Sequence, residues 1–133
     1  MSDIKQVIVI RKDLKMRRGK EIAQGAHASM KWLVDRLEYR TRALNAHFYH
    51  EPSFSDVENG WLQGLFKKVC LQVNSEEELI DIYTKAFGAG LVVKLITDSG
   101  LTEFDGVPTR TCLAIGPDLA ELIDPITKEL KLY

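Results

Sequence analysis

The segment QVIVIR, at residues 6–11, is a run of apolar, β-branched side chains between two polar ends. Such a run is typical of a strand that is buried on both faces, because a strand with one solvated face alternates apolar and polar side chains. A strand of this kind needs a layer of helices on each side of its sheet. With 133 residues, the chain is long enough to bury such a core as one domain, spanning residues 1–133.

The other predicted elements agree with this architecture. A helical pattern begins near Gly19. Its apolar positions predict one core-facing stripe, made of Ala23, Ala26, Met30, Leu33, Val34 and Leu37. The elements expected after it are strands at 67–73, 91–97 and 111–116 and helices at 75–88 and 118–124. We therefore expect an α/β fold with helices on both faces of a small sheet.

Local signals predict where these later helices begin and end. Ser75 is expected to cap the free amides of its helix, with Glu78 closing the capping box, and Gly88 or Gly90 to end it. The last helix is expected to stop at Pro125.

The segment at residues 39–66 interrupts this order. The helical pattern weakens from about Tyr39, and Pro, Ser, Asp and Gly then punctuate the chain as in a loop. We expect an extended helix/loop insert, with a short helix up to Trp61.

Charge is distributed unevenly along the chain. Residues 1–45 hold eleven Lys and Arg against five Asp and Glu, whereas the remainder holds seven against fourteen. A basic segment on an otherwise acidic chain can steer a polyanion to one face. A solvated helix surface accounts for the same charges equally well.

The cysteines and the N-terminus indicate an intracellular protein. Cys70 and Cys112 lie in apolar, strand-like runs, so buried free thiols are expected rather than a disulfide. The N-terminal apolar run is short and charged at both ends, which fits neither a signal peptide nor a membrane span.

One face of the first helix carries the candidate site. On a helix, Lys20, Gln24, His27 and Lys31 fall within an arc of roughly 60°. His27 lies nearest the apolar stripe and is expected to be partly buried. Alone it would be interpreted as a structural histidine, but with its polar neighbours it is a candidate site residue.

A basic turn precedes this face, and Gly19 ends it. Lys15, Arg17 and Arg18 can bind phosphates, and the missing side chain of Gly19 would expose helix amides to an anion. The polar segments 12–20 and 98–110 both leave the carboxyl ends of predicted strands, so we expect them to meet at one edge of the sheet.

Other motifs are weaker. The RRGK segment lacks the spacing of a phosphate-binding P-loop, and no GxSxG nucleophile elbow is present. His47 and His50 have helical spacing, but a metal site would need further ligands, so none is predicted.

Three ordered segments carry a resemblance to a known family. They are VIVIRKDLKMRRGKEIAQGAHA, GLVVKLITDSGLTEF and TCLAIGPDLAELIDPITKELKLY. Together they resemble the type-2 peptidyl-tRNA hydrolases over nearly the whole chain except about residues 39–66. The resemblance implies a three-layer α/β/α sandwich with a small mixed four-stranded sheet, often found as a homodimer.

The resemblance also implies an activity. It implies a cytoplasmic enzyme without metal or organic cofactor and without membrane attachment, whose partner is tRNA. The enzyme hydrolyses the ester between a peptide and the 3′ ribose of tRNA, which recycles tRNA from stalled translation. Two alternatives remain, a non-catalytic tRNA or RNA-binding module and a protein-interaction role for the long insert.

The family positions are carried over residue by residue. The catalytic candidates are Lys20, His27 and Asp98, and the substrate-binding candidates are Lys15, Arg17, Arg18, Gly19, Gln24, Thr102 and Thr111. Which of them is the general base stays open, and Asp98 is expected either to orient His27 or to accept from it.

The chain departs from the family pattern at two places. The usual Gly-Lys-Gly-Lys is Arg17-Arg18-Gly19-Lys20, and the usual Thr-Gln is Thr102-Glu103. The second change adds a negative charge near the site.

Overall fold

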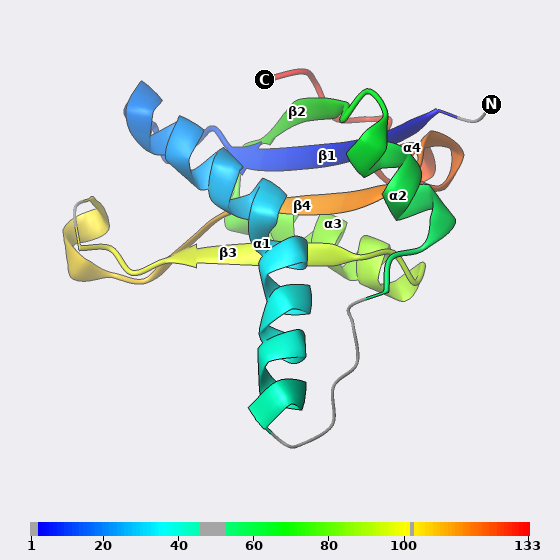
Figure 1. Ribbon diagram of the computed structural model, residues 1–133. Helices are drawn as coiled ribbons and strands as arrows, with labels where there is room; N and C mark the ends of the chain where they lie inside the picture. The colour runs from blue at the N-terminus through cyan, green and yellow to red at the C-terminus, as the bar shows by residue number, and fades with distance from the viewer. Residues whose placement is uncertain (1–2, 46–52, 102) are drawn as a thin grey trace.

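A computed structural model describes residues 3–45, 53–101 and 103–133. Its sheet has the strand order β2-β1-β4-β3 (Figure 1). The strands are β1 (Ile4–Arg11), β2 (Lys68–Val73), β3 (Val93–Asp98) and β4 (Thr109–Leu119). β1 pairs with β2 in parallel and with β4 antiparallel, and β4 pairs antiparallel with β3, so the sheet is mixed.

Helices cover both faces of this sheet. The helices are α1 (Arg18–Asn45), α2 (Asp56–Gln63), α3 (Glu76–Gly88) and α4 (Ala120–Thr127). In Figure 1, α1 crosses in front of the strands and α3 lies behind them. The expected α/β/α sandwich with a mixed four-stranded sheet is therefore confirmed.

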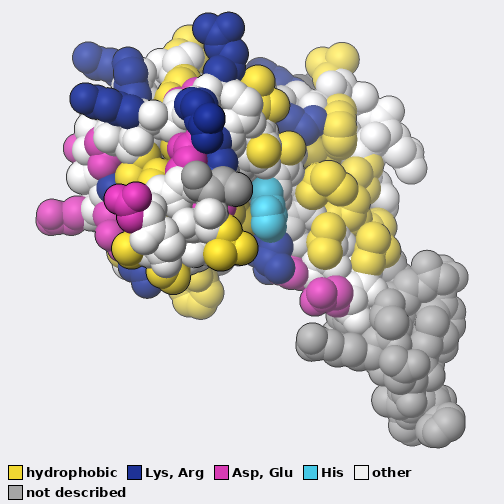
Figure 2. Space-filling model, turned by 90° about the vertical axis from the view of Figure 1, so that its left-hand side faces the viewer, with side chains coloured by type: hydrophobic (Ala, Val, Ile, Leu, Met, Phe, Trp, Pro, Cys, Tyr) yellow, Lys and Arg dark blue, Asp and Glu magenta, His cyan; other side chains and the backbone are white. Residues whose placement is uncertain are grey.

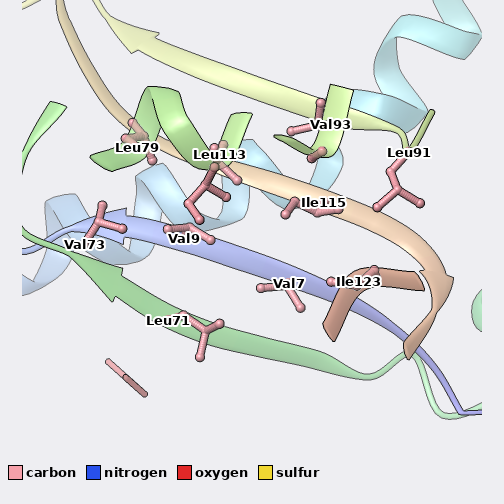
Figure 3. Packing of buried hydrophobic residues seen from close by; sticks show 12 residues of the cluster. Val7, Val9, Leu71, Val73, Leu79, Leu91, Val93, Leu113, Ile115 and Ile123 are labelled. Atoms are coloured by element: carbon pink, nitrogen blue, oxygen red, sulfur yellow. The ribbon is translucent and has the colours of Figure 1, made fainter. Parts of the chain in front are cut away.

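β1 is buried on both faces, as its sequence predicts. Val7 and Val9 point into the core beneath α3 and α4, which Figure 3 shows together with Leu79 of α3 and Ile123 of α4. The alternating residues Ile8 and Ile10 face the smaller core beneath α1. A strand that contributes to two cores cannot alternate in polarity, which explains the continuous apolar run.

The predicted core stripe of α1 is wrong. Ala23, Ala26, Met30, Val34 and Leu37 are exposed and Leu33 is only half-buried. The helix buries its small and polar residues instead, namely Gln24, Gly25, Ala28 and Ser29, together with Trp32. This face lets α1 approach the sheet closely: a side chain at Gly25 would contact Ile10, and Ser29 exchanges hydrogen bonds with Gln6.

The insert begins later than expected. α1 continues through Tyr39 to Asn45, and the short helix up to Trp61 is present as α2. α2 has a capping box that was not predicted, in which Ser55 accepts from the Glu58 amide and the Glu58 carboxylate accepts from the Ser55 amide.

The capping box predicted for α3 is half correct. Ser75 accepts from the Glu78 amide, but the Glu78 carboxylate accepts from the amide of Asn74, one residue before the cap. The helix ends at Gly88 as expected.

The end of the chain also differs from expectation. α4 contains Pro125 instead of stopping there. The proline removes one amide donor from the helix, but the Lys128 amide still donates to the Asp124 carbonyl and completes the last turn. The tail then pairs with β2: the Tyr133 amide donates to the Cys70 carbonyl at 3.0 Å. This pairing covers an otherwise open sheet edge.

Both cysteines are free thiols, as expected, although only Cys112 is fully buried and Cys70 is half-buried. No helix in the described part of the chain is both long enough and apolar enough to cross a membrane.

Candidate active site

The two polar segments meet at one edge of the sheet. β1 and β3 both pair antiparallel with β4, so their carboxyl ends lie on the same side. Two ion pairs join the segments that follow these ends, Lys20 with Asp98 and Arg17 with Glu103. The expectation that residues 12–20 and 98–110 come together is confirmed.

The pair between Lys20 and Asp98 is the centre of the site. The Lys20 Nζ and the Asp98 Oδ1 are 2.8 Å apart, and the two side chains are only 16% and 10% exposed. The hydrogen bond from Lys20 holds the pKa of Asp98 below its ordinary value, although desolvation opposes it, and the Gly100 amide and the charges of Lys20 and His27 lower that pKa further. Asp98 is therefore a carboxylate at neutral pH.

The second carboxylate oxygen of Asp98 shapes its own loop. Oδ2 accepts from the Gly100 amide at 2.9 Å. Gly100 has φ +82°, and a Cβ there would lie 2.4 Å from the Val107 carbonyl oxygen, so only glycine fits. Asp98 is thus a loop cap and a partner of Lys20 at once. The Asp-x-Gly spacing, which is typical of an Asx-turn, was the available signal for Gly100.

Gln24 and Thr111 form a buried layer behind the pair of Lys20 and Asp98. Thr111 is fully buried, and its hydroxyl donates to Oε1 of the buried Gln24. This bond leaves the Gln24 amide nitrogen directed at Oδ1 of Asp98, 3.4 Å away. The structure therefore places Thr111 behind Gln24, where it orients the amide.

His27 lies beside the pair, one helical turn beyond Gln24. Its charge acts on Asp98, but the hydrogen bonds described for Asp98 come from Lys20, Gln24 and Gly100. The expected partial burial of His27 is wrong: the ring is exposed because the apolar stripe next to it faces solvent. In Figure 2 the cyan histidine lies between charged side chains and a yellow apolar patch.

The basic turn forms the outer rim. Lys15, Arg17 and Arg18 are exposed, and the Arg17 guanidinium pairs with Glu103 at 2.9 Å. Gly19 lies in the first turn of α1, where an added Cβ would meet nothing within 4 Å, so packing does not require glycine there. Of the other predicted residues, Thr102, His47 and His50 lie outside the described residues.

Cys112, the thiol nearest the site in sequence, is not suited to act as a nucleophile. Burial raises the pKa of Cys112, next to Thr111, to about 11, so that thiol stays protonated at neutral pH. Within residues 3–45, 53–101 and 103–133, no group of three His, Cys, Asp or Glu side chains is placed to hold a metal ion. The site instead offers an oriented ammonium, a carboxylate and an imidazole beside a cationic rim.

A family model and the sequences of curated proteins both match this chain over nearly its whole length. The family model described as "Peptidyl-tRNA hydrolase PTH2" matches residues 4–133. A peptidyl-tRNA hydrolase of Methanocaldococcus jannaschii is 43% identical over 97% of this chain and 99% of its own, and one from Nanoarchaeum equitans is 43% identical over 98% and 99%.

More distant similarities agree with these matches. A probable peptidyl-tRNA hydrolase 2 of Dictyostelium discoideum is 41% identical over the whole of this chain, which spans 56% of that protein. A solved structure of an Agrobacterium protein of unknown function has a TM-score of 0.59 over 100% of this chain and 99% of its own. At 15% identity, that likeness concerns the fold alone.

Proposed function

Because the chain belongs to the PTH2 family of peptidyl-tRNA hydrolases, we propose that it hydrolyses the ester between a peptide and the 3′ ribose of tRNA. The observation that carries the proposal is the half-enclosed pair of Lys20 and Asp98, supported by Gln24 and open to the cationic rim. The two rival roles, a non-catalytic binding module and an interaction surface on the insert, would not need this partly buried ion pair.

The reaction requires a water molecule to attack the ester carbonyl carbon. The oxygen of that carbonyl then gains negative charge, which the Lys20 ammonium is placed to stabilise. The bond from carbon to the ribose 3′ oxygen breaks, and the departing oxygen takes up a proton. The products are a peptide with a free carboxylate and tRNA with a free 3′ hydroxyl.

Asp98 and His27 have different roles in this proposal. Lys20 and the Gly100 amide lower the pKa of Asp98, which makes it a weak base. We therefore propose that Asp98 holds the Lys20 ammonium in position and does not take up a proton. Histidine is the commonest general base in enzymes, and His27 is exposed at the mouth beside this pair. We therefore propose that His27 is the general base, which takes a proton from the attacking water.

The proposed activity is tested with two substrates that share one tRNA. We expect the purified protein to cleave N-acetylated peptidyl-tRNA at least about tenfold faster than aminoacyl-tRNA. The free α-ammonium of an aminoacyl group would be repelled by Lys20 and the rim. Release of acid-soluble peptide is the measurement. No cleavage of peptidyl-tRNA above the uncatalysed rate would refute the assigned activity.

Arg17 and Arg18 are assigned to the tRNA backbone. Replacing both with alanine should raise KM several-fold, leave kcat nearly unchanged and reduce the salt dependence of binding, because fewer counterions are released. The control is Lys85→Ala, since Lys85 is also an exposed cation but lies on α3, across the sheet from the site. A loss of kcat at saturating peptidyl-tRNA would mean that these arginines take part in catalysis.

The remaining expectations complete the proposal. Residues 1–133 act as one domain, the substrate partner is tRNA, and the activity takes place in the cytoplasm, where translation supplies the substrate. A homodimer follows from the family resemblance, and light scattering of the purified protein checks it.

A further inference from the structure

The solvent face of α1 carries a groove next to the site. This groove, of about 330 Å³, is lined by Ala23, Ala26, His27, Met30, Lys31 and Val34, and we call it the α1 groove. His27 is at once a wall of the groove and a member of the candidate active site. Figure 2 shows the same continuity, with the yellow apolar patch beginning directly beside the cyan histidine.

The wall of the groove is mainly apolar. Met30 is 57% exposed and Val34 is 39% exposed, and with Ala23 and Ala26 they form one continuous apolar patch rather than scattered exposed side chains. Lys31 is the one cation among the lining residues, and its ammonium is paired with Asp35 at 2.9 Å. The groove therefore suits an uncharged, apolar ligand better than a polyanion.

The order of features along α1 gives the groove a direction. The cationic rim lies at the amino end of the helix, the Lys20, Gln24 and His27 side chains follow, and the groove continues toward Val34. A substrate that joins a polyanion to a peptide through one ester has the same order of parts. With its ester at Lys20 and its phosphates on the rim, its peptide must leave in the opposite direction, along the groove.

The length of the groove agrees with this path. Gln24 and Val34 are about ten residues apart, which corresponds to roughly 15 Å along a helix. An extended peptide covers that distance with four to five residues, at roughly 3.3 Å each.

We propose that the α1 groove binds the few residues of the peptide that lie nearest the ester in peptidyl-tRNA, and that it favours apolar side chains there. This binding presupposes the proposed function and specifies which peptides are preferred. A helix surface offers no free backbone donors in its middle turns, so the preference depends on side-chain contact and not on a strict sequence.

The test variant alters the α1 groove, and the control alters a second groove on the other side of α1. Met30→Gln/Val34→Thr keeps the size of both side chains and makes the groove polar. The control is Ile22→Gln. Ile22 is 66% exposed and lines a neighbouring apolar groove on the β2 side of α1. That groove shares Ala26 and Met30 with the α1 groove but contains neither Val34 nor Lys20 nor His27, so Ile22→Gln reports whether binding there explains the preference.

The substrates are two N-acetylated tetrapeptidyl-tRNAs with the same tRNA and the same esterified lysine. One carries three leucines before the lysine and the other carries three serines. We expect the unaltered protein to favour the leucine substrate about tenfold in kcat/KM. Met30→Gln/Val34→Thr should reduce that ratio to about threefold or less, whereas Ile22→Gln should retain it.

The outcomes separate the two proposals. Equal kcat/KM for both substrates in the unaltered protein, or a ratio that Met30→Gln/Val34→Thr leaves at tenfold, overturns peptide binding in the groove while leaving the hydrolase activity in place. Cleavage of neither substrate overturns the hydrolase activity and the groove with it. If light scattering shows that the double variant dissociates a dimer and slows both substrates equally, the groove is an interface between copies and the peptide assignment is wrong.

Discussion

Asp98→Asn is expected to lower kcat by about 10² while the melting temperature changes by only a few degrees. The carboxylate accepts from the Lys20 ammonium through one oxygen and from the Gly100 amide through the other. An asparagine of the same shape has one acceptor oxygen and no charge, so it cannot hold both donors. The ammonium then loses its fixed position, and a loss of about 10² is the usual size for a misplaced catalytic group.

The pH dependence should separate Asp98 from the base. Its pKa in the folded protein is lowered, so the interaction with Lys20 adds stability above the ordinary pKa and is lost as the pH falls through the folded value. Activity that depends on Asp98 should therefore be constant from about pH 5 upward. Any decrease of kcat/KM as the pH is lowered from 7 to 5 should also occur in Asp98→Asn, because the Asp98 carboxylate does not take up a proton in that range.

The control for this substitution is Asp81→Asn. Asp81 forms a similar ion pair with Lys85 at 2.9 Å, but on the exposed surface of α3. It should retain full activity, which separates the loss of the site from the loss of any surface carboxylate. An Asp98→Asn protein that melts much earlier yet turns over at the normal rate while folded would reduce Asp98 to a loop cap.

Lys20→Met is expected to lower kcat by about 10² as well, and the double variant Lys20→Met/Asp98→Asn should be scarcely slower than either single variant. Methionine keeps most of the length of lysine and removes its charge. If Asp98 acts by orienting Lys20, removing the second residue of the pair costs little once the first is gone. Single-turnover kinetics of the three variants measures the coupling directly.

Multiplied effects would contradict this assignment. A double variant slower by about 10⁴ would mean that Asp98 acts on water or substrate independently of Lys20. The control for the charge is Lys85→Met, which should leave turnover unchanged because Lys85 lies on α3, away from the site.

Several features of the fold could be predicted from the sequence because they depend on local patterns. The uninterrupted run in β1 predicted burial on both faces, and Ser75 and Gly88 marked the ends of α3. The carboxyl ends of β1 and β3 predicted that the polar segments 12–20 and 98–110 would meet. Each of these inferences uses either the residues of one element or the direction of a strand.

The orientation of α1 was decided only by the tertiary structure. Its most apolar stripe predicted the buried face, but the sheet beneath it offers Gln6, which exchanges hydrogen bonds with Ser29, and Ile10, which lies close to the backbone at Gly25. Close approach and paired hydrogen bonds to β1 therefore outweighed the area of exposed Met30 and Val34. The consequence is functional, since this rotation exposes His27 and places the α1 groove beside it.

The pairing within the site was decided in the same way. The sequence determined which chemical groups are present at the edge of the sheet and that the basic turn and the loop after β3 would lie close together. It did not determine that Asp98 would bind Lys20 and Gly100 instead of His27, or that Thr111 would be buried behind Gln24. Those choices depend on side-chain contacts between segments up to 87 residues apart in the chain, which only the packing of α1 against β3 and β4 sets.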